Sequence, residues 1–363
     1  MDTTTPRSQG ISRDLQISRE ILKLRKTFGK EIGERIGIAN NKLNIYFERA
    51  FIRWIFNIVM IGLNPFKDLI TADMFVSSQD VDYFAKKHGY RSNFSTFSWQ
   101  WLTDKFETIY NINGIPAGIT TRIMLEQKVV LTYNWPRIEK VSYSFPTQMY
   151  QRAVKLYTGD LDKMDDLILL LVSRYDACGT TNNHCSVPPG LISFCDVTTE
   201  MFGSPLNTCA RQYCSPFPDI EMHFGSLGSF FNPKLEFSTG VYLMNPPYDE
   251  DIMSFAVQKT ITALKSKAEL TIIVVLPVWD PESQKSIEGK TNFNKKFEAL
   301  DTITSCGYMK SKLILSFANY PFFDYYLNNY VKVTDTHLIV LSNTNCELNV
   351  VDIAHQWVKV SSN

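Results

Sequence analysis

The stretch Gly240-Val241-Tyr242-Leu243-Met244-Asn245-Pro246-Pro247-Tyr248 joins a short apolar run to two prolines and an aromatic residue. An uninterrupted apolar run of this length is typical of a strand that is buried on both faces. The prolines end the strand, because proline fixes its own backbone and has no N–H to donate to a neighbouring strand. Residues 249–265 then have helical spacing. We therefore predict a strand, a turn and a helix in succession.

The same alternation continues along the second half of the chain. Short apolar runs at residues 270–276, 313–316 and 337–341 predict further strands, and residues 293–300 predict another helix. Buried strands that alternate with helices are typical of an α/β fold with a mostly parallel sheet covered on both faces. Ligands of such sheets bind beyond the carboxyl ends of the strands, where Asn245 to Tyr248 fall.

The residues Asn245, Pro246, Pro247 and Tyr248 suit one kind of chemistry. They look like the N-P-P-[YFW] catalytic motif of adenine and other amino-group methyltransferases, which use S-adenosylmethionine. An exocyclic amino group is a poor nucleophile, because its lone pair is delocalised into the ring. The Asn245 side-chain carbonyl and the Pro246 backbone carbonyl can accept hydrogen bonds from that group and localise the lone pair. Tyr248 offers a face on which a base can stack. The alternative is a turn that only ends a strand.

A second segment, from Glu200 to Asn207, has the pattern of a strand end, a small-residue loop and a helix start. Ser204 is suited to the N-cap and Pro205 to the first helical position. The positive end of such a helix suits the methionine carboxylate of the cofactor. An acidic side chain, Glu200 or Asp219, suits the ribose hydroxyls or the amino group. The alternative is an ordinary capped helix without a ligand.

Four strings of residues, taken in order, resemble one family. They are Ser204-Pro205-Leu206-Asn207, Arg211-Gln212-Tyr213-Cys214-Ser215-x-Phe217-Pro218-Asp219, Phe224-Gly225-Ser226-x-Gly228 and Asn245-Pro246-Pro247-Tyr248. This set is similar to the phosphorylated-CTD-interacting-factor family, whose members are cap-specific adenosine N6-methyltransferases acting on mRNA that begins with 2′-O-methyladenosine. The resemblance is strong over residues 187–283 and weaker as far as residue 343.

The resemblance implies a Rossmann-like class I methyltransferase domain with S-adenosylmethionine as cofactor, and we expect no metal. It implies that Asn245, Pro246, Pro247 and Tyr248 hold the target adenine. Tyr248 stands where the family usually has phenylalanine, a change that preserves stacking. The residues expected to line the cofactor are Glu200, Phe202, Gly203, Ser204, Pro205, Asn207, Asp219, Phe224, Gly225, Ser226 and Asn245.

Composition and charge indicate how the rest of the chain is organised. The 363 residues are 44% hydrophobic and 20% charged, enough for one large or two ordinary globular domains. The 37 basic and 37 acidic side chains balance, which excludes a generally basic nucleic-acid coat. Residues 1–53 nevertheless hold eleven basic and six acidic side chains. We therefore predict a mainly helical, RNA-binding domain over residues 1–150 and a methyltransferase domain over residues 151–363.

The candidate contacts to RNA or its cap are basic residues near the amino terminus and one tryptophan. They are Arg19, Lys23, Arg25, Lys26, Lys30 and Trp279, with Lys86, Lys87 and Arg91 as further candidates. A solvated helix face is the alternative interpretation of the basic residues, and core packing that of the tryptophan. No tryptophan pair has the spacing of a WW module, so we expect no module that reads the polymerase tail. The sequence does not indicate a protein partner.

Cysteine usage and the amino terminus indicate the cellular environment. Five of the seven cysteines fall between residues 178 and 214, but none is spaced as C-x-x-C. Reduced thiols are therefore a better interpretation than a zinc site. The polar start has no secretory signal, and the apolar run at residues 55–63 is too short to span a membrane. These features predict an intracellular protein, nuclear or cytoplasmic, without a membrane partner.

Three hypotheses for the function follow from these observations. The first is N6-methylation of the cap-adjacent 2′-O-methyladenosine of capped mRNA. The second is N6-methylation of adenine in internal RNA or in DNA, because the chemistry of the motif does not depend on the polymer. The third is a catalytically silent, RNA-binding subunit with a methyltransferase fold.

Overall fold

The structure is a computed structural model that describes residues 6–35, 41–60, 62–68, 70–71, 74, 98–179, 184–279 and 297–362. The chain divides into two compact units, the first made of Met1–Tyr150 with Gly159–Asn182 and the second of Gln151–Thr158 with Asn183–Asn363. Helix α5 (Thr147–Leu156) contains one of the boundaries. Lys86, Lys87 and Arg91 lie outside the described residues.

The first unit is built on helices, as predicted. Its helices are α1 (Pro6–Arg35), α2 (Asn41–Met60), α4 (Gln100–Tyr110) and α6 (Met164–Ala177), the last preceded by the short helix η3 (Leu161–Lys163). Helix α1 packs against α2, α4 and α6. Its buried residues Leu15, Ile21, Leu24, Phe28 and Ile32 recur at helical spacing, which explains why this segment forms one long amphipathic helix.

A three-stranded antiparallel sheet completes the first unit. Its strands are β1 (Ile119–Met124), β2 (Lys128–Asn134) and β3 (Val141–Pro146), in that order. The alternation of residues 119–133 predicts the pair β1 and β2, whereas β3 was not predicted. Val129, Leu131 and Tyr133 of β2 are buried at every second position, and β2 contacts α6. The amino-terminal region is therefore helical with one added sheet.

The second unit contains the α/β fold that the alternating runs predict. Its six-stranded sheet has the order β6-β5-β7-β8-β12-β9. The bounds are β5 (Val197–Glu200), β6 (Gln212–Tyr213), β7 (Gly240–Met244), β8 (Leu270–Pro277), β9 (Met309–Leu315) and β12 (Thr336–Ser342). Strands β6, β5, β7 and β8 are parallel. Strand β12 is antiparallel to both of its neighbours, so the mostly parallel sheet that was predicted is a mixed sheet with one antiparallel strand.

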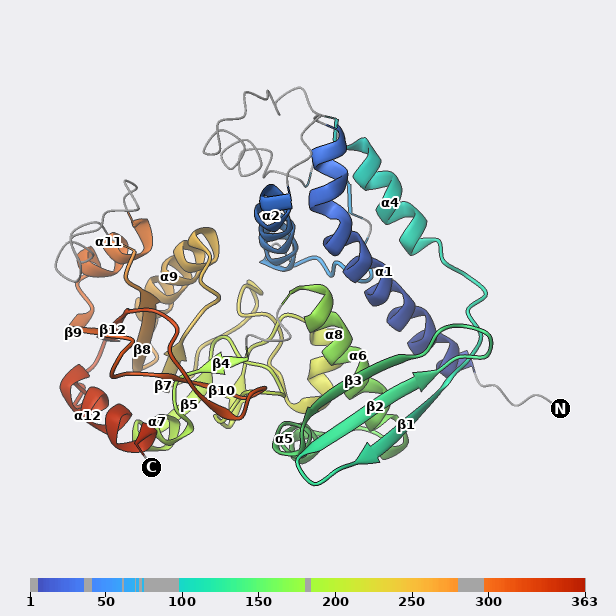
Figure 1. Ribbon diagram of the computed structural model, residues 1–363. Coiled ribbons are helices and arrows are strands. Elements are labelled where there is room, and N and C mark those ends of the chain that lie inside the picture. The colour runs from blue at the N-terminus through green and yellow to red at the C-terminus, as the bar shows by residue number, and fades with distance from the viewer. Residues whose placement is uncertain are drawn as a thin grey trace. The chain divides into compact units, whose positions relative to one another are not determined.

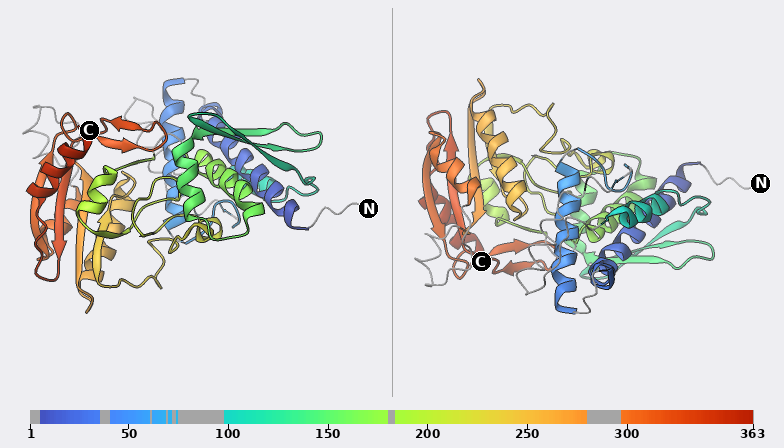
Figure 2. Two further views of the ribbon diagram at one scale, coloured as in Figure 1. Left: turned by 90° about the horizontal axis from the view of Figure 1, so that it is seen from below. Right: turned by 90° about the horizontal axis from the view of Figure 1, so that it is seen from above.

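Both faces of this sheet are covered, as the uninterrupted apolar strands predict. All eight residues of β8 are buried. Their alternate side chains enter two cores, because successive residues of a strand point to opposite faces. Helices α9 (Glu250–Leu264) and α11 (Glu298–Ser305) cover one face, and α7 (Pro189–Phe194) and α12 (Val350–Ser361) cover the other (Figure 1; Figure 2).

A small second sheet lies in the same unit. It consists of β4 (Cys185–Ser186), β10 (Phe322–Asp324) and β11 (Asn329–Val331), all antiparallel, with β10 in the middle. This sheet brings residues near 185 beside residues near 324. Among the described residues, no helix is both long and apolar enough to cross a membrane.

Candidate active site

The order of the parallel strands locates the candidate site. From β5 the chain goes to β6 on one side and then to β7 on the other, so the winding direction reverses between β5 and β7. Open α/β sheets bind ligands at such a reversal, beyond the carboxyl ends of the strands. The two segments singled out in the sequence, residues 201–207 and 245–248, begin at these two strand ends.

The turn after β7 is held rigidly. Pro246 is buried, while Asn245 and Tyr248 are half-buried. The Asp249 N–H donates to the Pro247 carbonyl at 2.8 Å. Asp249 also caps α9, because its Oδ1 accepts from the N–H groups of the second and third helical residues at 3.1 and 3.2 Å. The predicted strand, turn and helix are confirmed, and they fix the backbone on both sides of Asn245.

Aromatic side chains from three elements meet beside this turn. Trp279 follows β8, the neighbour of β7, and its ring lies 6.4 Å from the Tyr248 ring at an interplanar angle of 75°. Phe297, just before α11, lies 5.8 Å from Trp279. The Tyr248 ring thus packs edge-on against Trp279, which was predicted to contact the cap. The expected contact of Trp279 with a cap stays a prediction.

The Tyr248 hydroxyl is buried and has no hydrogen-bond partner among the described residues. Burial raises the pKa of Tyr248, and the neighbouring Cys185 thiol raises it further. A buried hydroxyl without a partner costs free energy, so such a group is suited to bonding a ligand or water. The Cys185 thiol itself donates to Asp324 Oδ2 at 3.5 Å.

The loop after β5 differs from its sequence prediction. Ser204 and Pro205 do not begin a helix; residues 205–207 form a single turn. Asn207 Oδ1 accepts from the Ser204 N–H at 2.9 Å, and Ser204 Oγ accepts from the Leu206 N–H at 3.2 Å. Serine and asparagine side chains can close a turn in this way in place of a helix. Residues 204–207 therefore offer no positive helix end to the methionine carboxylate, and that prediction is wrong.

Glu200 accepts hydrogen bonds from residues 208–210, near the carboxyl end of this loop. It is 2% exposed, and its Oε1 accepts from Thr208 Oγ1 at 2.9 Å and from the N–H groups of Cys209 and Ala210 at 2.8 and 3.0 Å. Burial raises the pKa of Glu200, while these three hydrogen bonds lower it. Oε1 is therefore engaged by the loop itself rather than pointing to a ribose.

The segment after β6 lies at the same edge of the sheet as the loop after β5, and we call it the wall beyond β6. Gly225 and Gly228 have positive φ angles of 84° and 86°, which suit glycine. Between them, Ser226 pairs with Tyr213 of β6 as a parallel bridge, and its Oγ lies 2.5 Å from Ser215 Oγ. The resulting turn lies beside the end of β6, on the side away from β5.

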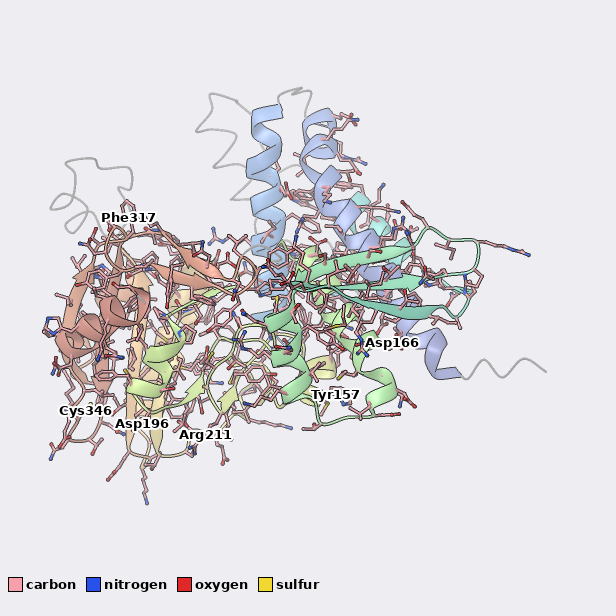
Figure 3. All side chains as sticks on the ribbon, turned by 60° about the horizontal axis from the view of Figure 1, so that its bottom comes forward. Tyr157, Asp166, Asp196, Arg211, Phe317 and Cys346 are labelled. Atoms are coloured by element: carbon pink, nitrogen blue, oxygen red, sulfur yellow. The ribbon has the colours of Figure 1, made fainter. Side chains whose placement is uncertain are left out.

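The remaining expected cofactor residues have different degrees of exposure. Asp219 lies half-buried on α8 (Pro218–Glu221), and Gly203 donates its N–H to the Cys214 carbonyl at 2.9 Å. Phe202 is half-buried and packs against Phe230 at 5.0 Å. Phe224, at the end of η4 (Met222–Phe224), is completely buried and packs against Tyr157, with 5.1 Å between the ring centroids. Figure 3 labels Tyr157. Phe224 therefore acts as a core residue of this wall.

Arg152 contacts the loop after β5 and was not identified in the sequence. It lies on α5, and its Nη1 donates to the Leu206 carbonyl at 3.2 Å. Its guanidinium carbon lies 4.3 Å from the centre of the Tyr325 ring. No local pattern marks this arginine, because its partners are more than fifty residues away along the chain.

The basic residues of α1 belong to the first unit and have different environments. Lys23, Lys26 and Lys30 are exposed, whereas Arg25 is 7% exposed. The Arg25 guanidinium pairs with Glu48 at 3.2 Å and donates to the Ala177 carbonyl at 3.3 Å. Arg19 pairs with Glu139. These contacts favour a structural role for Arg25 and leave the three lysines as the better candidates to meet RNA.

Cysteine, histidine and acidic side chains are the groups that could hold a metal ion. All seven cysteines lie among the described residues, and none forms a disulfide. In the described part of the chain, no three histidine, cysteine or acidic side chains are grouped as they would be around a metal ion. His184 is buried beside Asp324, and burial lowers its pKa to about 4, although Asp324 opposes this effect.

One comparison with known protein families covers the part of the chain that contains the candidate site. Residues 147–310 match the family described as the phosphorylated CTD interacting factor 1 WW domain. An mRNA (2′-O-methyladenosine-N(6)-)-methyltransferase of Mus musculus is 44% identical over 86 residues, which is 23% of this chain and 12% of the relative. The protein of the same name from Homo sapiens is 43% identical over an equal length. The chain thus covers about an eighth of the length of these two relatives.

The fold and these matches define the class of the molecule. It is an α/β protein with a six-stranded mixed sheet and an amino-terminal helical region, and its candidate site lies at the ends of parallel strands. Residues 147–310 match the phosphorylated-CTD-interacting-factor family, and the chain is distantly homologous to the mRNA methyltransferases over part of its length. The resemblance of the four strings of residues to this family is confirmed. The expectation that the chain has no WW module stays a prediction.

Proposed function

We propose that this protein transfers a methyl group from S-adenosylmethionine to the N6 amino group of adenosine in RNA, at the cap-adjacent 2′-O-methyladenosine of capped mRNA. The observation that carries the proposal is the position of Asn245-Pro246-Pro247-Tyr248. These residues follow β7 at the reversal of the sheet, within the range that matches the family. The cap-adjacent substrate is suggested by the names of the two mammalian relatives.

The sheet supports a Rossmann-like class I methyltransferase domain. Strands β6, β5, β7 and β8 follow the doubly wound order, with β5 and β6 on one side of the reversal and β7 and β8 on the other. The bridge between Tyr213 and Ser226 extends the sheet beyond β6, where a doubly wound sheet has one more strand. The antiparallel β12 between β8 and β9 adds a strand without disturbing the reversal.

The residues at the reversal fit an S-adenosylmethionine molecule. Residues 201–210 form a loop beyond β5, and Asp219 and Ser226 lie on the wall beyond β6. The Tyr248 hydroxyl is a buried polar atom that lacks a partner among the described residues, as expected where a ligand completes the site. We propose that Phe202, Gly203 and the turn 204–207 hold the cofactor together with Asp219 and Ser226. Bound there, S-adenosylmethionine would supply an electrophilic methyl group, and breaking its sulfur–methyl bond would leave S-adenosylhomocysteine.

The residues after β7 would prepare the nucleophile. The Asn245 side-chain carbonyl and the Pro246 backbone carbonyl would accept hydrogen bonds from the two N–H groups of adenine N6, so that its lone pair points away from the ring. These two acceptors need little reorganisation before methyl transfer, because Pro246, Pro247 and the cap at Asp249 hold the backbone. N6 loses one proton to water as the new carbon–nitrogen bond forms, so no strong base is required. His223, which is exposed, has no role in this scheme.

Radiolabelled methyl transfer tests the proposal. Wild-type protein should label capped RNA that begins with 2′-O-methyladenosine, and Asn245→Ala should lower the rate at least about 100-fold. Asn343→Ala, which removes an amide at the end of the sheet, is a matched control for the loss of a structural asparagine. Absence of label with the wild type, or equal label with Asn245→Ala, would contradict the proposal.

Substrate arms of the same assay distinguish the two other hypotheses. Equal labelling of uncapped RNA or of DNA would favour an N6-adenine methyltransferase that does not read the cap. A protein that neither labels RNA nor binds S-adenosylmethionine by calorimetry would be a silent subunit with the same fold. The four residues of the NPPY motif are intact, which favours an active enzyme over a silent one.

A further inference from the structure

Arg152 joins three parts of the second unit that are far apart in the sequence. Its guanidinium donates to the Leu206 carbonyl, which belongs to the turn after β5. The same group lies over the Tyr325 ring, just after β10, at a distance typical of a cation–π contact. Helix α5, the turn and the β10 segment therefore meet at one side chain.

Tyr325 is itself held in place by burial and by hydrogen bonds. It is 3% exposed, and its N–H donates to the His184 carbonyl at 3.2 Å. Its hydroxyl lies 3.1 Å from the Cys209 sulfur. Cys209 in turn donates its N–H to Glu200. The loop is thus fixed at its turn by Arg152 and at its end by Glu200 and Tyr325.

Charge gives Arg152 a second effect on the same loop. Glu200 is buried and accepts three hydrogen bonds from residues 208–210 through one oxygen. The positive charge of Arg152 favours the ionised form of this carboxylate. A charged carboxylate accepts stronger hydrogen bonds than a neutral one, so Arg152 strengthens the anchor at Glu200 as well as the bond at Leu206.

We propose that Arg152 is a positioning residue, which holds residues 201–210 in the conformation that binds S-adenosylmethionine. This inference rests on the proposed function, because it takes that loop as part of the cofactor site. Arg152 itself is not a catalytic residue. Its planar guanidinium satisfies the loop carbonyl at its edge and the aromatic ring at its face, a combination that lysine cannot reproduce. Loss of Arg152 should therefore weaken cofactor binding before it affects the chemical step.

The test compares Arg152→Ala, Arg152→Lys and the matched control Lys155→Ala. Lys155 lies on the same helix and is exposed. Arg152→Ala should raise the Kd for S-adenosylmethionine in calorimetry and its KM in the methyl-transfer assay by about tenfold, the effect of one charged hydrogen bond. The kcat at saturating cofactor and the KM for RNA should change less than about twofold. Arg152→Lys should recover part of the loss in cofactor affinity. Lys155→Ala should match the wild type.

Several results would overturn the inference. An unchanged Kd for S-adenosylmethionine in Arg152→Ala, or an equal rise in the KM for RNA, would do so. If Arg152→Ala lowers the melting temperature strongly, Arg152→Lys carries the test, and a wild-type Kd in that folded variant would refute a role for the planar group. Failure of the proposed function is seen separately, because it appears as wild-type protein that binds the cofactor but methylates no adenosine.

Discussion

Replacing Glu200 should distinguish the effect of its acceptor oxygen on the loop at residues 201–210 from the effect of its charge. Oε1 of Glu200 accepts from two backbone N–H groups and one hydroxyl of residues 208–210. Glu200→Gln keeps an acceptor oxygen in the same place, whereas Glu200→Ala removes it. We therefore expect the glutamine variant to keep the loop and the alanine variant to lose it.

The magnitude follows from the buried groups that each variant leaves without a partner. In Glu200→Ala the N–H groups of Cys209 and Ala210 lose their acceptor. Ala210 is buried whereas Cys209 is exposed, so the free energy of unfolding should fall by about 1–3 kcal/mol, the cost of one buried group without a partner. The Thr208 hydroxyl can rotate to another acceptor. In Glu200→Gln the same two N–H groups remain bonded, so the change should stay below about 1 kcal/mol. The difference is large beside a typical domain stability of about 5–15 kcal/mol.

The dependence on pH gives an independent check. Burial raises the pKa of Glu200 above its ordinary value of 4.5, so the folded chain binds this proton more tightly than the unfolded chain. The stability that Glu200 contributes is therefore greatest below pH 4.5 and declines as the pH rises through the raised pKa. Glutamine does not titrate, so Glu200→Gln should gain stability relative to the wild type over that window.

Urea unfolding followed by circular dichroism measures both effects, with Glu236→Gln at an exposed position as the control. Calorimetry measures the Kd for S-adenosylmethionine, which should rise if the variant loses the conformation of residues 201–210. If Glu200→Gln is as damaging as Glu200→Ala, the charge and not the acceptor atom holds the loop. If both variants match the wild type, the loop does not depend on Glu200, which would contradict this prediction.

Four further changes test the site and its surroundings. Tyr248→Phe should gain up to about 1 kcal/mol of stability in the free protein by removing an unpartnered buried hydroxyl, and should keep stacking while weakening ligand binding by up to about tenfold through one lost hydrogen bond. Tyr248→Ala should raise the KM for RNA about 10- to 100-fold through lost stacking. Because the pKa of His184 is lowered to about 4, protonation favours unfolding, and urea titrations should find stability falling from pH 6.5 towards pH 4, but not in His184→Gln. Trp357→Ala should cost about 3–5 kcal/mol in urea unfolding, because this ring is 0% exposed and donates to the Pro321 carbonyl. Lys26→Gln with Lys30→Gln should weaken RNA binding and reduce its salt slope by about one unit per lost contact, and an unchanged slope would exclude both lysines.

Much of the second unit could be predicted because its signals are local. The apolar runs that became β7, β8 and β12 are continuous, since each strand is buried on both faces. The helix after Tyr248 was equally clear, because Asp249 caps it and the turn residues precede it. A match to a family over residues 147–310 followed from the same segment of the chain.

Other features could not be predicted, because they depend on partners far along the chain. The helix expected at Ser204 and Pro205 is a turn, since Asn207 and Glu200 bond the backbone groups that a helix would have used. Arg25 has the same sequence signal as its exposed neighbours, and only packing against α6 and Glu48 buries it. The direction of β12 is likewise invisible in its composition, because a buried strand has the same residues in either direction.

The sequence by itself determined the local chemistry of this protein: a buried strand that ends in Asn245-Pro246-Pro247-Tyr248, followed by a capped helix. Only the tertiary structure decided what surrounds that motif. It placed Trp279 at the edge of Tyr248, engaged Glu200 with its own loop and brought Arg152 onto the Leu206 carbonyl. The physical reason is that periodicity and turn residues act over a few neighbours, whereas these contacts arise only when distant strands and helices pack together.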